Sequence, residues 1–434
     1  PSSIDTSSLN GTTGFSITGN SDRLGGAVSN AGDINGDNID DLIIGATGKS
    51  YIIFGKSSSF SPNLNASTLN GMNGFTINGN AAGTSVSSAG DINDDGIGDI
   101  IIGTGNSGDA YVVFGNSTGF SSNLELSTLD GSDGFMVNGR GDRSYVSSAG
   151  DVNDDGLDDI IIGSPSVSTR ANGEGECYLI FGQSNFNSIL DVSSLNGSNG
   201  FTLFNNDGII ASIGNSVSGG YDINNDNIDD FIIGAPRATP SNGNTRAGKS
   251  YIVFGGQNKF TQSSFELSGL DGDNGFVISG FEDRGEFGYS VSGLEDVNGD
   301  GIDDLITSAH YSNNYYGQCF VVFGKQGCIT VSPTLSVTVS SPQIEEDSGL
   351  NTLIYTFTAS LSPTCEDLTV KFAVSGDATY NDDYYLVRGS ENFNGSTGTT
   401  IIPVGQTSVD LVFQTQQDAI FESDESIIVM IENP

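Results

Sequence analysis

Residues 30–45 read Asn-Ala-Gly-Asp-Ile-Asn-Gly-Asp-Asn-Ile-Asp-Asp-Leu-Ile-Ile-Gly, and this stretch decides the fold because it recurs. Equivalent segments place their first aspartate at Asp91, Asp151, Asp222 and Asp296, roughly 60–75 residues apart. Self-similarity at such a period is typical of repeat architectures, in which each unit buries its faces only against its neighbours. The chain therefore contains five copies of one unit.

Each copy surrounds its acidic loop with four short segments of β type. One run, similar to Ser-Val-Ser, precedes the loop and an aliphatic run follows it, while the fourth run begins with Gly-Phe. The third run ends in Phe-Gly, at Phe54-Gly55, Phe114-Gly115, Phe181-Gly182, Phe254-Gly255 and Phe323-Gly324. Gly, Asn, Asp and Ser bound these runs, and no long segment has a helical period. Four-stranded units stacked radially are the blades of a β-propeller, so the repeat predicts an all-β fold.

The order of the runs along the chain predicts how the propeller closes. A Gly-Phe strand occurs before the first acidic loop, at residues 14–19, and none follows the fifth Phe-Gly pair. The chain is thus permuted by one strand, and we expect the N-terminal strand to complete the last blade beside Phe320–Gly324. A closed ring leaves few exposed edges. We predict a closed propeller of five four-stranded blades over residues 1–327; the alternative is a piece of a larger propeller.

The acidic loops carry oxygen side chains at positions 1, 3, 5 and 9, counted from the first aspartate. Such side chains converge in a tight loop, and the aliphatic residue at position 7 offers its backbone carbonyl, as in a helix-loop-helix calcium site. Gly or Asn at position 6 tolerates a left-handed backbone. One copy could be a solvated turn, but five favour metal sites. The predicted ligands are Asp33, Asn35, Asp37, Ile39 and Asp41; Asp91, Asn93, Asp95, Ile97 and Asp99; Asp151, Asn153, Asp155, Leu157 and Asp159; Asp222, Asn224, Asp226, Ile228 and Asp230; and Asp296, Asn298, Asp300, Ile302 and Asp304.

Ca²⁺ is the ion that this ligand chemistry favours, with about five ions in the propeller. Mg²⁺ demands tighter octahedral geometry and keeps its waters. Zn²⁺ prefers Cys and His, and neither residue type occurs in any of the loops.

The repeats resemble the FG-GAP repeats of the integrin alpha-chain propeller over about three quarters of the chain. The Gly-Ala-Pro element of that family is literal at residues 234–236, and its Phe-Gly element is literal at Phe287-Gly288. The resemblance implies Ca²⁺ held in strand-connecting hairpins on one propeller face, and an extracellular role in binding or adhesion. Two features depart from the family. Integrin propellers have seven blades with calcium in only some, and their ligand apparatus needs a partner beta chain, which nothing here implies.

The pattern changes after Gly327, where residues 328–334 are predicted to form a linker. Residues 335–434 alternate as longer strands and predict a β-sandwich. They resemble a Calx-beta domain through Glu345-Glu346-Asp347-Ser348-Gly349, Gly376-Asp377-Ala378-Thr379 with Asp382-Asp383-Tyr384, and Glu422-Ser423-Asp424-Glu425. The resemblance implies further Ca²⁺ at one edge, bound by Glu345, Asp383, Asp418 and Asp424; a solvated acidic rim is the alternative.

The sequence stops at Pro434, before the last strand of that family and the acidic run that follows it. The sandwich is therefore expected to lack an edge strand, which leaves backbone groups unpaired. Either more chain follows, or a neighbouring subunit supplies a strand by β-augmentation, which would assemble copies into a filament or lattice.

The amino-acid composition limits the kinds of molecule that the chain is expected to bind. The 434 residues include 14 Lys+Arg and 54 Asp+Glu, and the formal net charge is −40. Such a surface repels phosphate backbones and anionic lipid, so no nucleic-acid partner is expected. No apolar stretch is long enough to span a membrane. The expected partners are cations, an extracellular protein or glycan, or a second copy of the chain.

Two classes of function are compatible with these patterns. The first is a secreted or cell-surface calcium-binding protein of adhesion or assembly; the second is a glycan-acting or glycan-binding propeller with paired carboxylates in its channel. The repeated position of the acids, and the absence of Trp as a sugar-stacking surface, favour the non-enzymatic class.

His310 is the single histidine and supports no catalytic triad. Arg140-Gly141-Asp142 contains an Asp-Arg element that recurs in other copies and is predicted to be structural. Cys328 and Cys365 flank the domain junction and could form a disulfide.

Overall fold

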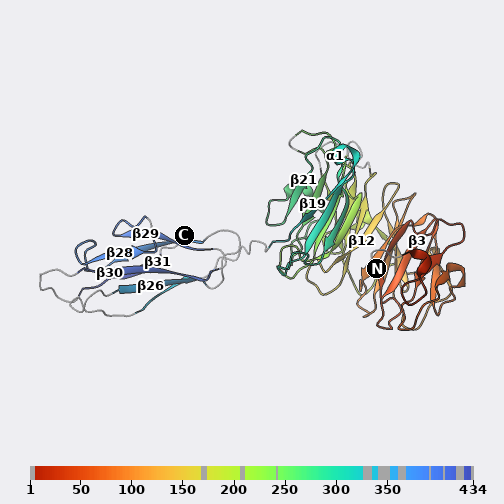
Figure 1. Ribbon diagram of the computed structural model, residues 1–434, viewed down its shortest axis with the longest axis horizontal. Helices are drawn as coiled ribbons and strands as arrows, with labels where there is room; N and C mark the ends of the chain where they lie inside the picture. Colours follow the sequence, from red (N-terminus) through yellow and green to blue (C-terminus); the bar gives the residue numbers. More distant parts are fainter. Residues whose placement is uncertain are drawn as a thin grey trace. The chain divides into compact units, whose positions relative to one another are not determined.

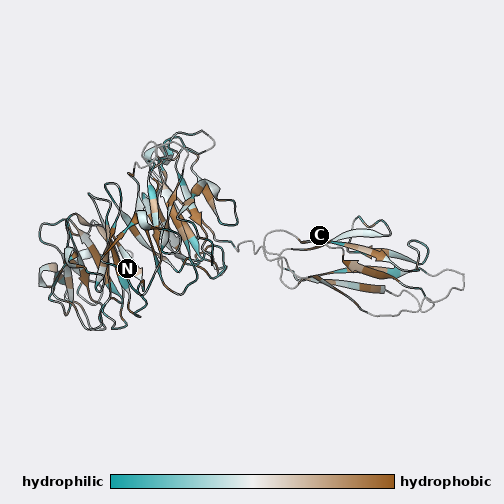
Figure 2. Ribbon diagram, turned by 180° about the vertical axis from the view of Figure 1, so that it is seen from behind, coloured by the Kyte–Doolittle hydropathy of each residue, from teal (hydrophilic) through white to brown (hydrophobic). Residues whose placement is uncertain are grey.

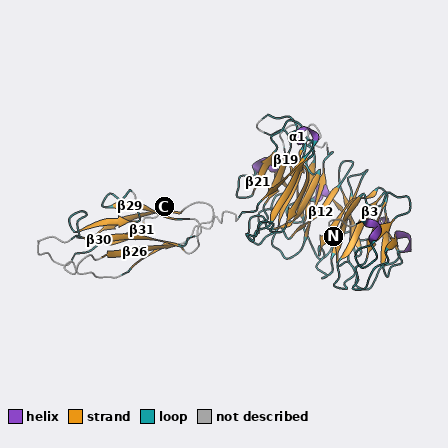
Figure 3. Cartoon of the chain, viewed as in Figure 1, coloured by secondary structure: helices purple, strands orange, loops and turns teal. Residues whose placement is uncertain are grey.

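The computed structural model describes residues 5–167, 174–205, 211–240, 243–325, 335–340, 352–359, 368–390, 392–403, 406–416 and 425–431. The chain divides into two compact units, Pro1–Lys325 and Gln326–Pro434. Strands dominate both units, and the helices described are single short turns (Figure 3).

The first unit is a succession of small antiparallel sheets, one for each sequence repeat, which we call blades 1 to 5. Within a blade the strands pair antiparallel and in chain order. The acidic loop connects the first two strands, and a longer connection leads from the third strand to the fourth. Blade 1 contains β2 (Ala27–Gly32), β3 (Asp41–Ala46), β4 (Lys49–Ile53) and β6 (Gly74–Asn78); blade 2 contains β7 (Ala82–Gly90), β8 (Asp99–Thr104), β9 (Ala110–Val113) and β11 (Gly134–Asn138); blade 3 contains β12 (Tyr145–Gly150), β13 (Asp159–Ser164), β14 (Glu176–Ile180) and β16 (Gly200–Phe204); blade 4 contains β17 (Ser216–Tyr221), β18 (Asp230–Ala235), β19 (Lys249–Val253) and β21 (Gly275–Ser279); and blade 5 contains β22 (Phe287–Leu294), β23 (Asp304–Ala309) and β24 (Gln318–Val322).

Neighbouring blades are joined by a short strand that we call a strap. The strap lies between the third and fourth strands of one blade and pairs in parallel with the fourth strand of the preceding blade. A turn of 3-10 helix follows each strap, and the single α-helix, α1 (Ser312–Tyr315), lies between β23 and β24. The straps are β5 (Asn63–Asn65), β10 (Asn123–Glu125), β15 (Ile189–Asp191) and β20 (Ser264–Glu266), and the 3-10 turns are η1 (Thr6–Ser8), η2 (Ala66–Thr68), η3 (Leu126–Thr128), η4 (Val192–Ser194) and η5 (Leu267–Gly269).

The hydrophobic core lies between blades rather than within one. The first strands pack in sequence, β2 on β7, β7 on β12, β12 on β17 and β17 on β22, and Figure 1 shows β3, β12 and β19 following one another across the unit. Ile43 and Ile52 of blade 1, for example, share a cluster with Ile100 and Ile102 of blade 2. Figure 2 shows this hydrophobicity along the strands, with hydrophilic residues in the connections. Each blade thus supplies one side of a hydrophobic core, and the neighbouring blade supplies the other side.

The third strand of each blade comes very close to the acidic loop at its Phe-Gly pair. A Cβ atom on Gly115 would lie 2.4 Å from the backbone oxygen of Gly98 and 2.4 Å from Cγ2 of Ile97. The other four glycines of these pairs meet the equivalent backbone oxygen at 2.1–2.6 Å. Only glycine permits this approach, which explains why Phe-Gly recurs.

The predicted ring closure is not observed. The N-terminal strand β1 (Ser16–Thr18) pairs in parallel with β5, whereas we expected it beside Phe320–Gly324. Within the described residues, blade 5 therefore has three strands, and β24 pairs only with β23. β1 occupies the position of a fourth strand relative to the strap β5, as β6 does relative to β10.

The second unit consists of two sheets with one core between them. One sheet has the order β25 (Leu335–Val339), β26 (Thr352–Ala359), β30 (Ser408–Thr415), β28 (Tyr384–Arg388), and the other β29 (Thr397–Ile402), β27 (Leu368–Ser375), β31 (Ile428–Ile431). Phe357, Phe372 and Phe413 are fully buried in the shared cluster. The alternation of buried and exposed residues along β26 and β27 follows the period of two that the sequence shows. The predicted linker, residues 328–334, lies outside the described residues.

Candidate metal centres

The aspartate at position 9 of each acidic loop is the most buried carboxylate of the first unit. Asp41, Asp99, Asp159, Asp230 and Asp304 all have 0% exposure, at the start of the second strand of their blades. Each accepts one N–H from position 2 of its own loop and one from the Phe-Gly glycine. In the second loop these bonds are 3.1 Å from Ile92 and 2.8 Å from Gly115. Position 9 therefore fastens the loop to the third strand.

Burial makes the charged form of these carboxylates costly. Desolvation, with a smaller effect of the neighbouring loop aspartates, raises the pKa of Asp99 and of Asp230 to about 8 and that of Asp41 to about 6. The pKa of Asp159 is likewise raised well above its usual range by burial. Two N–H donors do not offset the loss of water around these anions, and a bound cation would do so.

The aspartates at positions 1 and 5 shape the turn. Asp91 accepts the N–H groups of Asp95 (3.1 Å) and Gly96 (2.8 Å), and Asp95 accepts that of Ile97 (2.9 Å). The other loops repeat these bonds. The backbone at position 6 has positive φ in all five loops, as the sequence predicts; position 4 does as well, which the sequence analysis missed.

The asparagine at position 3 supplies the observation that points to a cation. The Oδ1 atoms of Asn93, Asn153 and Asn224 are buried and accept no hydrogen bond within the described residues. A buried oxygen without a donor costs roughly 1–3 kcal/mol. Each of these oxygens belongs to the same nine-residue loop as a fully buried carboxylate. The donor set consists of carboxylate, amide and carbonyl oxygens, which is the set that Ca²⁺ prefers.

The carboxylates of the acidic loops do not by themselves form a metal-binding cluster. Among the residues that the structure describes, no three His, Cys, Asp or Glu side chains gather closely enough to bind a metal ion. The position-1 and position-5 carboxylates instead bind N–H groups of their own loop. A cation held in these loops would therefore also need the amide oxygen at position 3 and the carbonyl at position 7.

The candidate ligands of the second unit are not brought together by the structure. Glu345, Asp418 and Asp424 lie outside the described residues, as do Cys328 and Cys365. Asp383 is described, and its carboxylate accepts the N–H of Thr379 within a turn before β28.

The aspartate at position 8, which was not among the predicted ligands, links one blade to the next. Asp158 of blade 3 accepts the N–H of Asp91 in blade 2 (2.8 Å), and Asp229 of blade 4 accepts that of Asp151 in blade 3 (2.8 Å). Asp303 of blade 5 accepts the N–H of Asp222 (3.1 Å). Position 8 is aspartate in four of the five loops, which was a signal that the metal pattern obscured.

Replacing Asp229 by alanine is expected to lower the free energy of unfolding by about 1–2 kcal/mol, because the N–H of Asp151 loses its acceptor. Urea denaturation in EGTA measures this effect without a contribution from bound cations. Asp273→Ala is the matched control, because Asp273 is an exposed aspartate of the same blade and lies outside the acidic loop. Equal midpoints for the two variants would contradict a role of position 8 between blades.

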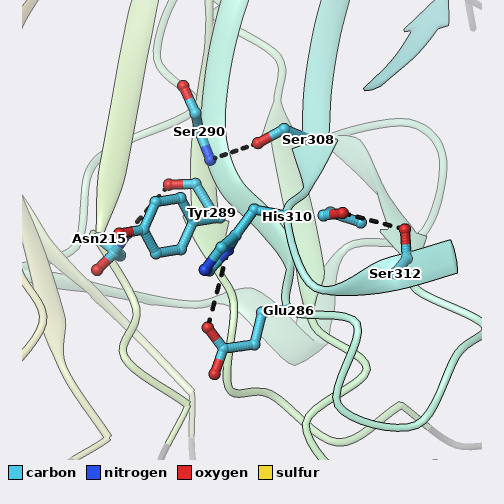
Figure 4. Close-up of polar contacts among 8 residues, drawn as sticks. Asn215, Glu286, Tyr289, Ser290, Ser308, His310 and Ser312 are labelled. Atoms are coloured by element: carbon cyan, nitrogen blue, oxygen red, sulfur yellow. Dashed lines mark hydrogen bonds and ion pairs between the residues drawn. The ribbon is translucent and has the colours of Figure 1, made fainter. Parts of the chain in front are cut away.

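His310, the single histidine, lies among aromatic and acidic side chains of blade 5 (Figure 4). Its ring centroid is 3.8 Å from those of Tyr289 and Tyr311, and its Nδ1 is 4.0 Å from Glu286 Oε2. Ser308 and Ser312, drawn nearby, bond to the backbone of Ser290 and of Ala309 rather than to the imidazole. The arrangement packs His310 as an aromatic residue.

The Arg140-Gly141-Asp142 segment is tied to blade 3 by hydroxyl groups. Ser164 donates to the carbonyl of Arg140, and Ser166 donates to the carboxylate of Asp142. Gly141 has φ +91°, which a residue with a side chain adopts only with strain. These contacts agree with the structural role that the sequence predicts for the segment.

Comparison with known proteins identifies the repeat. Residues 145–180, 213–253 and 287–322, which fall in blades 3, 4 and 5, match the FG-GAP repeat. Integrin alpha-5 of Xenopus laevis is 24% identical over 196 residues, 44% of this chain and 16% of that protein. Integrin alpha pat-2 of Caenorhabditis elegans is 28% identical over 233 residues, 52% of this chain and 18% of that protein. The FG-GAP resemblance is thereby confirmed for three of the five copies.

A relative of a different kind is an enzyme by name. Phosphatidylinositol-glycan-specific phospholipase D of Bos taurus is 32% identical over 121 residues, 27% of this chain and 14% of that protein. The chain thus spans less than a fifth of the length of each of these three relatives. Among the described residues, no helix is both long and apolar enough to cross a membrane.

Proposed function

We propose that the first unit is a calcium-binding module, with one Ca²⁺ in each acidic loop, that acts outside the cell in adhesion or surface assembly. The observation that carries the calcium assignment is the buried, unpaired amide oxygen at position 3 of three loops, in Asn93, Asn153 and Asn224, in the same loop as a carboxylate of 0% exposure. The other two loops are included because they repeat the same residue pattern. The ligands in each loop are the side chains at positions 1, 3, 5 and 9 and the carbonyl at position 7.

When bound, Ca²⁺ would supply positive charge beside the buried aspartates. The residues of the chain connect each loop to its surroundings. Position 9 remains bonded to the Phe-Gly glycine, and position 8 to the preceding blade. Order in the loop is thereby transmitted to the third strand and to the neighbouring blade.

Calorimetric titration of the metal-free 434-residue chain with Ca²⁺ tests the assignment. We expect about five ions for the first unit, with Mg²⁺ binding much more weakly at the same sites. The variant Asp99→Asn should lose one ion, and Asp94→Asn, at the exposed fourth position of the same loop, should lose none. A titration without measurable heat, supported by an absence of bound ⁴⁵Ca, would exclude the sites.

The extracellular role is supported by the similarity to integrin alpha chains and by the charge of −40. The five fully buried aspartates of this unit all belong to the repeated loops, which favours a binding module over an enzyme. Binding of the chain to glycan arrays and to immobilised extracellular-matrix proteins, in Ca²⁺ and in EGTA, would identify the ligand class. Because one relative is a phospholipase by name, release of product from glycans or from phosphatidylinositol-glycans would overturn the non-enzymatic assignment.

For the second unit we propose a Calx-beta-like sandwich with Ca²⁺ bound by Glu345, Asp383, Asp418 and Asp424. Its support is the two-sheet architecture together with the acidic motifs of the sequence. The quadruple variant with each acid changed to its amide should bind fewer ions than the parent chain while keeping about five. An unchanged stoichiometry would remove these sites.

Calcium binding should be steeply dependent on pH. The metal-free pKa near 8 of Asp99 and Asp230 means that a proton must leave before Ca²⁺ binds. When the pKa of a carboxyl group is higher in the folded than in the unfolded state, the protonated group stabilises the metal-free fold at low pH. That contribution is lost as the pH rises through the folded-state pKa. The increase in melting temperature caused by Ca²⁺ should therefore shrink between pH 8 and pH 5.5, with affinity falling roughly tenfold per pH unit at these loops. A Ca²⁺-induced shift that is constant over this range would contradict the burial of these acids.

A further inference from the structure

The four interfaces between consecutive blades share a backbone link from one acidic loop to the next; we number the loops as their blades. Between blades 2 and 3, Gly182 donates its N–H to the position-9 carboxylate of Asp159 (2.9 Å), and Gln183 donates to the carbonyl of Ile92 (3.0 Å). The N–H of Ile92 in turn binds Asp99, the position-9 carboxylate of loop 2 (3.1 Å). The same bonds occur at the other three interfaces. The buried carboxylates of neighbouring loops are therefore connected through the backbone.

A second link, made by the side chain at position 8, occurs at three of these interfaces and not at the first. Asp158, Asp229 and Asp303 each accept the N–H of the position-1 aspartate in the preceding loop, at 2.8–3.1 Å. Loop 2 has Gly98 at position 8, so it has no side chain there to accept the N–H of Asp33. The bond observed at this interface runs in the opposite direction, from the N–H of Gly98 to the carbonyl of Asp33 (3.2 Å). The interface of blades 1 and 2 thus differs from the others in one side chain.

The space for a position-8 carboxylate is nevertheless present at the first interface. A Cβ atom on Gly90 of blade 2 would lie 2.1 Å from Oδ2 of Asp158, so glycine at this point makes room for the carboxylate. Gly32 is the equivalent residue of blade 1, and the nearest atom to its Cβ position is Ser88 Oγ at 3.4 Å. Gly98 has no positive φ, and a Cβ atom there would come no closer than 3.5 Å to its surroundings. An aspartate at residue 98 would therefore fit.

Position 8 connects the ligand residues of two loops. Asp158 stands between Leu157 and Asp159, which supply a carbonyl and a carboxylate to the proposed site of loop 3. The residue that Asp158 binds, Asp91, supplies the position-1 carboxylate of loop 2. Order in loop 3 thus fixes Asp158, and Asp158 fixes the first ligand residue of loop 2. A ligand group that is already in place reduces the conformational cost of binding, and the charge of Asp158 adds attraction for a cation.

We propose that the position-8 carboxylate is a positioning residue for the calcium site of the preceding blade. It couples loops 2, 3, 4 and 5 in series, so that a filled loop raises the affinity of the loop before it. Loop 1 retains only the backbone link and lies outside this series. Because binding free energies are linked, the coupling is reciprocal: a filled loop 2 raises the affinity of loop 3 by the same factor. The inference rests on the proposed calcium sites and adds a difference among loops that have ligands of the same kind.

Peptide-resolved hydrogen exchange of the 434-residue chain measures each loop separately. The readout is the free Ca²⁺ concentration at which the peptides spanning residues 33–41, 91–99, 151–159 and 222–230 become half protected. Asp158→Ala should raise this midpoint roughly tenfold for loop 2, because the N–H of Asp91 loses a charged acceptor. Loop 4 should keep its midpoint, since its link from Asp303 is intact.

Asp154→Gly is the matched control for the loss of charge. Asp154 is an exposed residue of loop 3 with φ +60°, a conformation that glycine adopts readily. This variant removes one carboxylate from the same loop and leaves the bond between Asp158 and Asp91 in place. Equal midpoints of loop 2 in the two variants would overturn the proposal.

Gly98→Asp adds the missing link and should lower the midpoint of loop 1 roughly tenfold, with no change in loop 4. Damage to the fold does not produce a gain in affinity, so this variant remains informative if Asp158→Ala is poorly folded. Asn123→Asp is the control, because it adds the same charge at an exposed residue of the strap β10. A midpoint of loop 1 that is the same in Gly98→Asp and in this control would contradict the proposal.

Asp155→Asn separates coupling between loops from a purely local effect of Asp158. It removes a proposed ligand charge of loop 3 at position 5 and leaves Asp158 in place. Loop 2 should then need roughly fivefold more Ca²⁺ or higher, while loop 1 is unchanged; an unchanged loop 2 would overturn the series. Midpoints that are measurable in every loop but insensitive to position 8 would refute the coupling and leave the calcium sites standing. No Ca²⁺-dependent protection in any loop would remove the sites and the coupling together.

Discussion

Chelation of Ca²⁺ with EGTA is expected to lower the melting temperature of the first unit by about 20 °C or more. A ligand that binds only the folded state at a hundred times its Kd contributes about 2.7 kcal/mol, and five such sites contribute roughly 13 kcal/mol. One kcal/mol shifts the melting temperature of a unit of this size by about 2–4 °C. Differential scanning calorimetry in Ca²⁺ and in EGTA measures the shift.

The buried aspartates make the effect larger than surface carboxylates would. Without the ion, the fold holds Asp99, Asp159 and Asp230 either protonated or as costly buried anions. Adding Mg²⁺ to the EGTA sample is the control, because it restores ionic strength and divalent charge without the preferred geometry. Superimposable curves in Ca²⁺ and EGTA would remove the metal assignment altogether.

The second large effect is expected from Asp159→Asn, and its size should depend on Ca²⁺. With Ca²⁺ bound, loss of a fully buried anionic ligand should reduce the free energy of unfolding by about 3–5 kcal/mol, because the ion is left without its counter-charge. In EGTA the loss should be smaller, about 1–2 kcal/mol. An amide carries no desolvated charge, but its single oxygen can accept only one of the two N–H groups, of Val152 and Gly182, that bind separate oxygens of Asp159. Urea denaturation in both conditions measures the pair of values.

Asp154→Asn provides the matched control for this variant. Asp154 is an exposed residue of the same loop, it has φ +60°, and asparagine tolerates that backbone. Its substitution should change neither value by more than a few tenths of a kcal/mol. Destabilisation of Asp159→Asn by the same amount with and without Ca²⁺ would mean that the residue has only a structural role.

The strands of each blade were predictable because the repeat presents the same pattern five times. The strand propensity of one short segment is weak evidence, but the same pattern in five copies is strong evidence. The runs at Ile100–Gly103 and Ile160–Gly163 form the expected second strands. The straps were not predicted. A strand such as Asn123–Glu125 has three residues, and its pairing depends on the edge that a neighbouring blade presents rather than on its own sequence.

The structure does not show the predicted closure, and the reason is physical. Counting strand types predicted that the N-terminal strand and the three strands of the last repeat make one blade, but a count contains no rotation angle. That angle depends on side-chain packing between blades and on the bonds from Asn116, Gln183, Gly256 and Lys325. These are long-range contacts, which a comparison of repeat copies does not contain.

The sequence singled out the candidate ligands but missed a structural role in the same loops. Oxygen side chains at alternate positions stood out because a calcium loop requires that spacing. Asp158, Asp229 and Asp303 were hidden because they stand next to the position-9 aspartates and add only another acid to an acidic run. Their role became clear from their partners, which lie in a different blade.

The core that each blade shares with its neighbours determines how such a molecule comes apart. Each blade depends on nearest neighbours, so an interior blade has two supports and a terminal blade has one. Loss of structure would begin at blade 1 or blade 5 and proceed inward, so that blade 3 opens last. Every additional neighbour would convert a fraying end into an interior and so lengthen the life of the whole array.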